Sequence, residues 1–155
     1  MANDITIFEN GDGGELLLTN EDIATVDGLT NMILLAWFGG NVQESTNENL
    51  SEQEQRQDWW GNSLFKEDNQ FNSSLEKTLN TASISSAGLV NIENSAKKDL
   101  EFLAKFGTIE VNASLLDGAK FEIEAIITEP NKKSLKSTFL WDATKKTVIN
   151  EYTIS

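Results

Sequence analysis

Apolar and polar residues alternate along most of the last third of the chain. Residues 108–115 (TIEVNASL) and 119–126 (AKFEIEAI) place an apolar side chain at nearly every second position, which is the period of a half-buried β-strand. An Asp-Gly pair separates the two runs, and parity predicts a three-residue hairpin loop, 116–118, with Gly118 in the left-handed conformation. The predicted pairs are Val111 with Ile123, Ala113 with Phe121 and Leu115 with Ala119.

A second hairpin is predicted after Pro130, which ends the preceding strand because proline cannot donate a hydrogen bond to a central ladder. A strand through Trp141 and the last strand of the chain are joined by a four-residue turn, 143–146. This register pairs Trp141 with Val148 and Ser137 with Tyr152. The last strand carries Tyr152 and Ile154 on its apolar side, and we expect it at a sheet edge, where free backbone groups can accept a strand from another chain.

Two segments have the apolar spacing of helices. Asp27 is a suitable N-cap for a helix that extends to Phe38 and ends before two glycines. Leu34 and Phe38 lie off the main apolar face of this helix, and a helix that is apolar on nearly all sides is buried or lies in an interface. The second helix is predicted from Ser86 to Phe106. Its core stripe consists of Leu89, Ile92, Ala96, Leu100 and Leu103.

The remaining segments have weaker patterns. Residues 5–8 are predicted to form a short strand, and two short extended runs around Thr19 are predicted to form a small hairpin. Residues 72–81 are a candidate for a short helix, whereas residues 41–57 lack apolar periodicity and are expected to form an exposed, mobile loop. The predicted fold is α+β. It is a single domain, 1–155, with a small N-terminal β unit, two main helices and a C-terminal antiparallel sheet of two hairpins.

Composition removes several classes of function. The chain has 25 acidic and 12 basic residues and a net charge of −13, which disfavours nucleic acid and anionic lipid as partners. It has no cysteine and no histidine, so thiol nucleophiles, thiolate zinc sites and histidine-based triads are excluded. The most apolar run, MILLAWF, is too short to span a bilayer, and we expect no secretory signal. We therefore expect no cofactor, no metal, no small-molecule substrate and no membrane partner.

Only carboxylates remain as acid–base groups near neutral pH. Glu122 and Glu124 lie two residues apart on a predicted strand, and their side chains therefore share one face. Hydrolysis of a glycoside requires two carboxyl groups on opposite sides of the scissile bond. Lys120 shares the face with the two glutamates, which is typical of an ordinary solvent-facing side. We therefore predict no catalytic residue in this chain.

Two adjacent tryptophans follow the polar segment, in the sequence QDWWGNS. Trp59 and Trp60 cannot share one face of a strand, so in an extended segment one ring points inward and the other outward. Three interpretations stay open: an anchor for the end of the loop with Gly61 in a turn, a hot spot for a protein partner, and a platform for a sugar ring.

The order of these motifs resembles the Mu-like phage baseplate proteins of the gene product 46 family. The strongest matching residues are Asp22-Ile23-Ala24-Thr25, Asp27-Gly28-Leu29 and Trp59-Trp60-Gly61. That family is similar to the small sheath-initiator wedge proteins of contractile tails, some of which are labelled lysozyme-like. Two features differ from the family. Asn131 follows Glu129 and Pro130 where relatives often carry arginine, and the polar spacer contains more Asn and Gln.

The resemblance implies a structural protein of the virion baseplate, assembled in the cytoplasm of a bacterial host. It would bind larger wedge subunits and initiate the sheath by strand exchange, and it implies no catalytic residue. The alternatives are a carboxylate-dependent peptidoglycan hydrolase and a sugar-binding module. The candidate partner-binding residues are Leu34, Phe38, Trp59, Trp60, Gly61, Tyr152 and Ile154.

Overall fold

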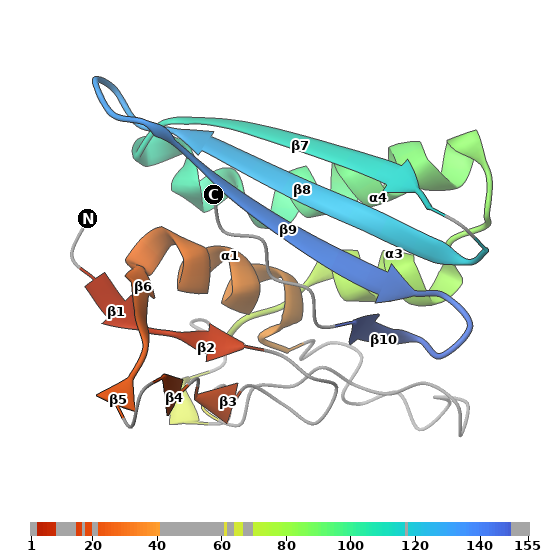
Figure 1. Ribbon diagram of the computed structural model, residues 1–155. Coiled ribbons are helices and arrows are strands. Elements are labelled where there is room, and N and C mark those ends of the chain that lie inside the picture. The colour runs from red at the N-terminus through yellow and green to blue at the C-terminus, as the bar shows by residue number, and fades with distance from the viewer. Residues whose placement is uncertain are drawn as a thin grey trace.

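A four-stranded antiparallel sheet carries the helices of the domain on one of its faces (Figure 1). The computed structural model describes residues 3–8, 15–16, 18–19, 22–40, 61, 64–66, 70–116 and 118–149. The strand order in the sheet is β10-β9-β8-β7. Its strands are β7 (Thr108–Leu115), β8 (Lys120–Thr128), β9 (Ser134–Asp142) and β10 (Thr147–Ile149).

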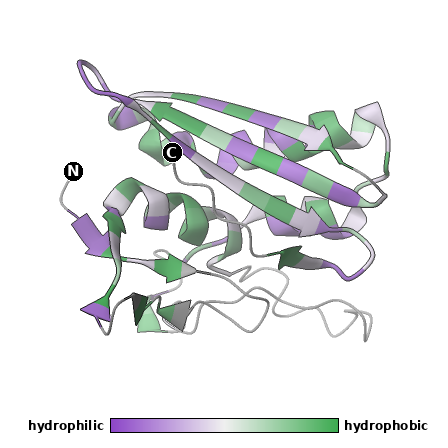
Figure 2. Ribbon diagram, in the orientation of Figure 1, coloured by the Kyte–Doolittle hydropathy of each residue, from purple (hydrophilic) through white to green (hydrophobic). Residues whose placement is uncertain are grey.

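Alternation along the strands gives the sheet one buried and one solvent-facing side, and Figure 2 shows this alternation along β7, β8 and β9. Every second residue of β8, and of β9 from Ser137 onward, packs beneath the helices and is buried. The buried side chains on this side of the sheet are Phe121, Ile123, Ala125, Ile127, Ser137, Phe139, Trp141 and Val148, and Leu140 and Asp142 of β9 are buried on the other side. The predicted α+β fold is therefore confirmed, with both hairpins in one sheet.

The first hairpin differs from the prediction in its loop. Leu115 pairs with Phe121, and not with Ala119. Ala119 belongs to the loop because its carbonyl accepts a hydrogen bond of 2.8 Å from the N–H of Ala143, in the neighbouring turn. Gly118 is left-handed as predicted, with a φ of 74°. The pairing moves by an even number of residues, so every side chain keeps its predicted face.

The second hairpin has the predicted register where it is described. Val148 pairs with Trp141 across the turn at 143–146. The side chain of Asp142 stabilises this turn by accepting hydrogen bonds from the N–H groups of Thr144 (2.9 Å) and Lys145 (3.0 Å). The predicted pair of Ser137 and Tyr152 lies outside the described residues, as does the predicted loop at 41–57.

In the described part of the chain, three α-helices cover the sheet, and each begins at a side-chain cap. They are α1 (Gly28–Phe38), α3 (Ser74–Thr81) and α4 (Ser86–Asp99). Asp27 caps α1 by accepting from the N–H of Leu29 at 2.9 Å, as predicted. Ser73 and Ser85 cap the other two helices in the same way. Helix α3 confirms the candidate short helix at 72–81.

The second predicted helix ends earlier than expected. Helix α4 stops at Asp99, and the chain continues as a 3-10 helix, η3 (Glu101–Lys105). Leu100 and Leu103 are both fully buried. Residues three apart eclipse one another in a 3-10 helix, so the tighter winding keeps both leucines on the core side.

The described part of the N-terminal β unit contains three short strand pairs. Strand β1 (Asn3–Ile5) pairs with β6 (Thr25–Asp27), β2 (Ile7–Phe8) with β3 (Glu15–Leu16), and β4 (Leu18–Thr19) with β5 (Asp22–Ile23). The predicted small hairpin is β4–β5. The predicted strand at 5–8 is interrupted at Thr6, whose N–H donates to the carbonyl of Ala24 at 2.8 Å.

Asn31, which is buried in α1, holds this interruption in place. Its Nδ2 donates to the carbonyl of Ile5 at 2.6 Å and to the Asp4 carboxylate at 3.1 Å. Its Oδ1 accepts from the N–H of Ile7 at 3.3 Å. One amide side chain thus attaches the N-terminal strands to the helix.

Trp37 and Asp99 join the three helices. The Nε1 of Trp37, in α1, donates to the carbonyl of Ala96 in α4 at 3.0 Å, and its ring meets Phe139 edge-on at 5.3 Å. The Asp99 carboxylate, at the end of α4, accepts from four donors at the start of α3. They are the Ser73 hydroxyl (3.2 Å), the Ser74 N–H (3.1 Å), the Ser74 hydroxyl (2.5 Å) and the Leu75 N–H (2.8 Å). A carboxylate at a helix N-terminus also interacts favourably with the helix dipole.

We expect Asp99→Ala to lower the free energy of unfolding by about 2–3 kcal/mol, because several charge-assisted hydrogen bonds are lost at a helix start. Asp99→Asn keeps one acceptor oxygen, and we expect it to lose about half as much. Urea denaturation measures both. The matched control, Glu101→Gln, removes one negative charge from an exposed site and should change stability by less than about 0.5 kcal/mol. Equal stabilities of Asp99→Ala and Glu101→Gln would contradict this role of Asp99.

Candidate functional site

The structure corrects two of the predicted partner-binding residues. Leu34 and Phe38 are each only 3% exposed, and the Phe38 ring packs against Phe139 at 5.7 Å. Helix α1 contacts α3, α4 and β9 on some sides and β1 and β6 on another, and Figure 1 shows it between the N-terminal strands and the sheet. Its all-round apolar surface is therefore used inside the domain, and these two residues present no surface to a partner.

The other predicted partner-binding residues are placed only in part. Gly61 is buried. Trp59, Trp60, Tyr152 and Ile154 lie outside the described residues. The described part of the last strand, β10, is at a sheet edge, as predicted.

Glu122 and Glu124 lie on the open, solvent-facing side of the sheet. Glu124 forms an ion pair with Lys136 of the neighbouring strand, and the hydrogen bond between them raises the pKa of Lys136. Glu122 is paired in register with Ser114 on one side and Leu140 on the other. The predicted solvent-facing role agrees with this placement, because the two glutamates stand side by side and do not face each other across a substrate.

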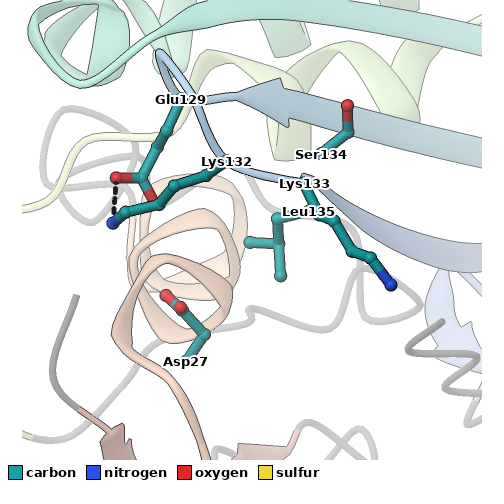
Figure 3. Close-up of a pocket in the computed structure, with 6 residues that line it drawn as sticks. All are labelled: Asp27, Glu129, Lys132, Lys133, Ser134 and Leu135. Atoms are coloured by element: carbon teal, nitrogen blue, oxygen red, sulfur yellow. Dashed lines mark hydrogen bonds and ion pairs between the residues drawn. The ribbon is translucent and has the colours of Figure 1, made fainter.

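A cleft of about 480 Å³ brings together two different carboxylates, at the start of α1 and the β8–β9 turn. Its lining residues are Asp27, Glu129, Lys132, Lys133, Ser134 and Leu135 (Figure 3). The Nζ of Lys132 donates to the Glu129 carboxylate at 2.6 Å, whereas the Lys133 side chain points away from this pair. The turn itself places Asn131 at a φ of 62°, a conformation that asparagine adopts more readily than most residues.

The cleft is balanced in charge, with two acidic and two basic side chains. The Asp27 carboxylate is engaged in capping α1, and Glu129 is bound to Lys132. The sequence predicts Asp27 as a helix cap and Glu129 as the end of a strand. It carries no signal that the two residues line one cleft, because they come from distant parts of the chain.

Exposed apolar side chains gather on the N-terminal β unit. Leu18 and Ile23 are 67% and 43% exposed, and they are direct cross-strand partners in β4–β5. Leu16 and Ile5 are also exposed. The sequence predicts the hairpin but not this exposed apolar surface. The signal for the surface is the apolar run at 16–18, which is longer than an isolated hairpin can bury.

Two kinds of feature are absent from the described residues. No helix there is long and apolar enough to cross a membrane. Within the same ranges, no three side chains of the metal-binding acidic, histidine or cysteine types gather into a group.

The chain has no match among family models, curated proteins or solved structures. The resemblance to the baseplate family is therefore carried by the sequence motifs alone.

The Lys132–Glu129 pair gives a pH prediction. The hydrogen bond with Glu129, together with the nearby charge of Asp27, raises the pKa of Lys132. A raised pKa in the folded state stabilises the protein below the ordinary lysine value, and this contribution is lost as the pH rises through the folded value. We expect Glu129→Gln to lower the pKa of Lys132, as measured by NMR titration of its side chain. Glu122→Gln is the control and should leave it unchanged, and an unchanged pKa in Glu129→Gln would show that the pair does not form in solution.

Proposed function

We propose that this chain is a structural, non-enzymatic subunit of the baseplate of a contractile-tailed phage, a prophage or a phage-derived particle. It binds larger wedge subunits and contributes to the start of the sheath. It is assembled in the cytoplasm of the bacterial host. The observation that carries the proposal is the position of the Asp22-Ile23-Ala24-Thr25 motif, which the resemblance rests on, at the exposed apolar surface of the N-terminal β unit.

Three steps support an assembly role for this surface. First, Asp22, Ile23 and Thr25 are exposed, so the motif does not serve mainly to fill the core. Second, Leu18 lies across from Ile23 and is the more exposed of the two. Third, exposed apolar side chains that lie together, as Leu18 and Ile23 do, are typical of a binding site for another protein. The net charge of −13 favours a partner with a basic face around this apolar surface.

The carboxylate-dependent hydrolase is the second candidate. It is favoured by one observation, that Asp27 and Glu129 line the same cleft. It is disfavoured by the partners of these carboxylates, since one caps a helix and the other binds a lysine. No specific observation on the described residues favours a sugar-binding module.

Co-expression with the products of neighbouring tail genes tests the assembly role. We expect affinity capture of this chain to recover a larger wedge protein. Leu18→Ser should weaken that complex about tenfold, since burying one leucine contributes roughly 1.5 kcal/mol or more. The matched control is Ile84→Ser, which removes another exposed apolar side chain and should leave the affinity unchanged. Recovery of no tail protein would contradict the proposal, and equal affinities of the two variants would contradict its binding surface.

A clearing assay on purified cell wall tests the hydrolase. We expect no release of sugar by the wild-type chain. Turnover that is lost in both Asp27→Asn and Glu129→Gln, but kept in Glu122→Gln, would replace the structural proposal with an enzymatic one.

A further inference from the structure

Among the described strands, β7 forms one edge of the sheet and has β8 as its single neighbour. The N–H of Leu116 donates to the carbonyl of Lys120 at 2.8 Å, which fixes the alternation of the antiparallel ladder. Even-numbered residues of β7 bond to β8, and the odd-numbered residues direct their N–H and C=O groups away from the sheet. The outward-directed residues are Ile109, Val111, Ala113 and Leu115.

Helix α4 closes this edge at one point. The N–H of Ala113 donates to the Glu93 carboxylate at 2.9 Å, which agrees with the outward direction of that N–H. In the described part of the chain, no hydrogen bond occupies the N–H of Ile109, Val111 or Leu115. The Glu93 carboxylate therefore takes the place that a backbone carbonyl of a neighbouring strand would occupy.

The rest of the edge lacks three features that often prevent strand addition, namely proline, lysine and a bulge. Strand β7 contains no proline and no lysine, and its eight consecutive pairs with β8 are not interrupted by a bulge. Natural edge strands are commonly protected by such residues or by bulges. A regular, eight-residue edge with one side-chain cap can accept an extended segment.

Charge and apolar surface define the segment that fits. Glu110 is exposed on the solvent side of β7 and lies opposite Ile126, so no cation on β8 faces it. A residue directly across from Glu110 on an added strand would have its Cβ about 4.5–5.5 Å away, which favours lysine or arginine there. On the helix side, Leu115 is 40% exposed and Val90, one turn before Glu93 in α4, is 52% exposed. On the added segment, apolar residues therefore fit at the alternate positions whose side chains face Leu115 and Val90.

We propose that the β7 edge binds an extended segment of a partner protein in which basic residues alternate with apolar ones, and that Glu93 occupies the edge until the segment displaces it. The inference rests on the proposed function only in taking the partner to be a neighbouring subunit of the same particle. A second copy of this chain is the less suitable occupant. Each copy has a net charge of −13, so two copies of this chain repel each other.

A defined peptide tests the proposal in the full-length protein. The probe is a blocked peptide of sequence Thr-Val-Lys-Val-Lys-Val-Thr, with a control peptide that has Glu in place of Lys. We expect the basic peptide to slow amide hydrogen exchange at Val111 and Leu115 at least tenfold, and the acidic peptide to have no effect. Added salt should weaken binding, because the charges are exposed.

Two pairs of variants test the charge and the cap. Glu110→Lys should reverse the preference between the peptides, whereas Glu101→Lys, with the same change in net charge at an exposed site in η3, should keep it. Glu93→Ala should bind the basic peptide about three- to tenfold more tightly, because the competing acceptor is gone. Glu93→Gln keeps an acceptor oxygen and should bind like the wild type.

Several results would overturn the inference. These are no protection of Val111 and Leu115 by the basic peptide, protection elsewhere only, and an unchanged preference in Glu110→Lys. Protection of the same amides by self-association without peptide would make a second copy the occupant. A wedge protein that binds and leaves the β7 amides unprotected would refute the edge site and leave the assembly role standing. If the peptide binds β7 but no tail protein is captured, the edge site stands and the assembly role is refuted.

Discussion

One helix, α4, fixes the positions of three other elements through polar contacts spaced three residues apart. The Glu93 carboxylate accepts from β7, the Ala96 carbonyl accepts from Trp37 of α1, and the Asp99 carboxylate accepts from the start of α3. At a rise of about 1.5 Å per residue, the three contacts lie within roughly 9 Å along the helix axis. The sheet, α1 and α3 are thus held by less than two turns of helix, and the rest of the core packs around this arrangement.

The three contacts differ in how completely they are satisfied, and this difference connects the fold to the proposed role. Asp99 accepts from four donors and the Trp37 contact is buried beside Phe139, so these two are costly to break. Glu93 makes one hydrogen bond at an otherwise open edge. The domain therefore keeps its helices in place, and the edge of its sheet is the part that the proposed partner segment would occupy.

Local signals were sufficient for most elements, and contacts between distant residues were not predictable. Asp27 predicted the start of α1, and alternation predicted the faces of β7 and β8 correctly even though the loop between them is longer than expected. The loop depends on a hydrogen bond from Ala143 in the next hairpin. The apolar residues of α1 that lie off its main face suggest a partner when only the sequence is considered. The N-terminal strands cover part of this helix, but they are too short for the sequence to indicate where they pack. The cleft at Glu129 and the Glu93 contact both join segments whose proximity only the fold defines.

Amide hydrogen exchange of the isolated protein, resolved by NMR, tests the central role of α4 most directly. The account predicts that the amides of Ser74, Leu75 and Ala113, which donate to Asp99 and Glu93, exchange slowly. It also predicts that Val111 and Leu115, on the same edge as Ala113, exchange at least tenfold faster. If Ala113 exchanges as fast as Val111 and Leu115, Glu93 does not hold the edge and the account is contradicted.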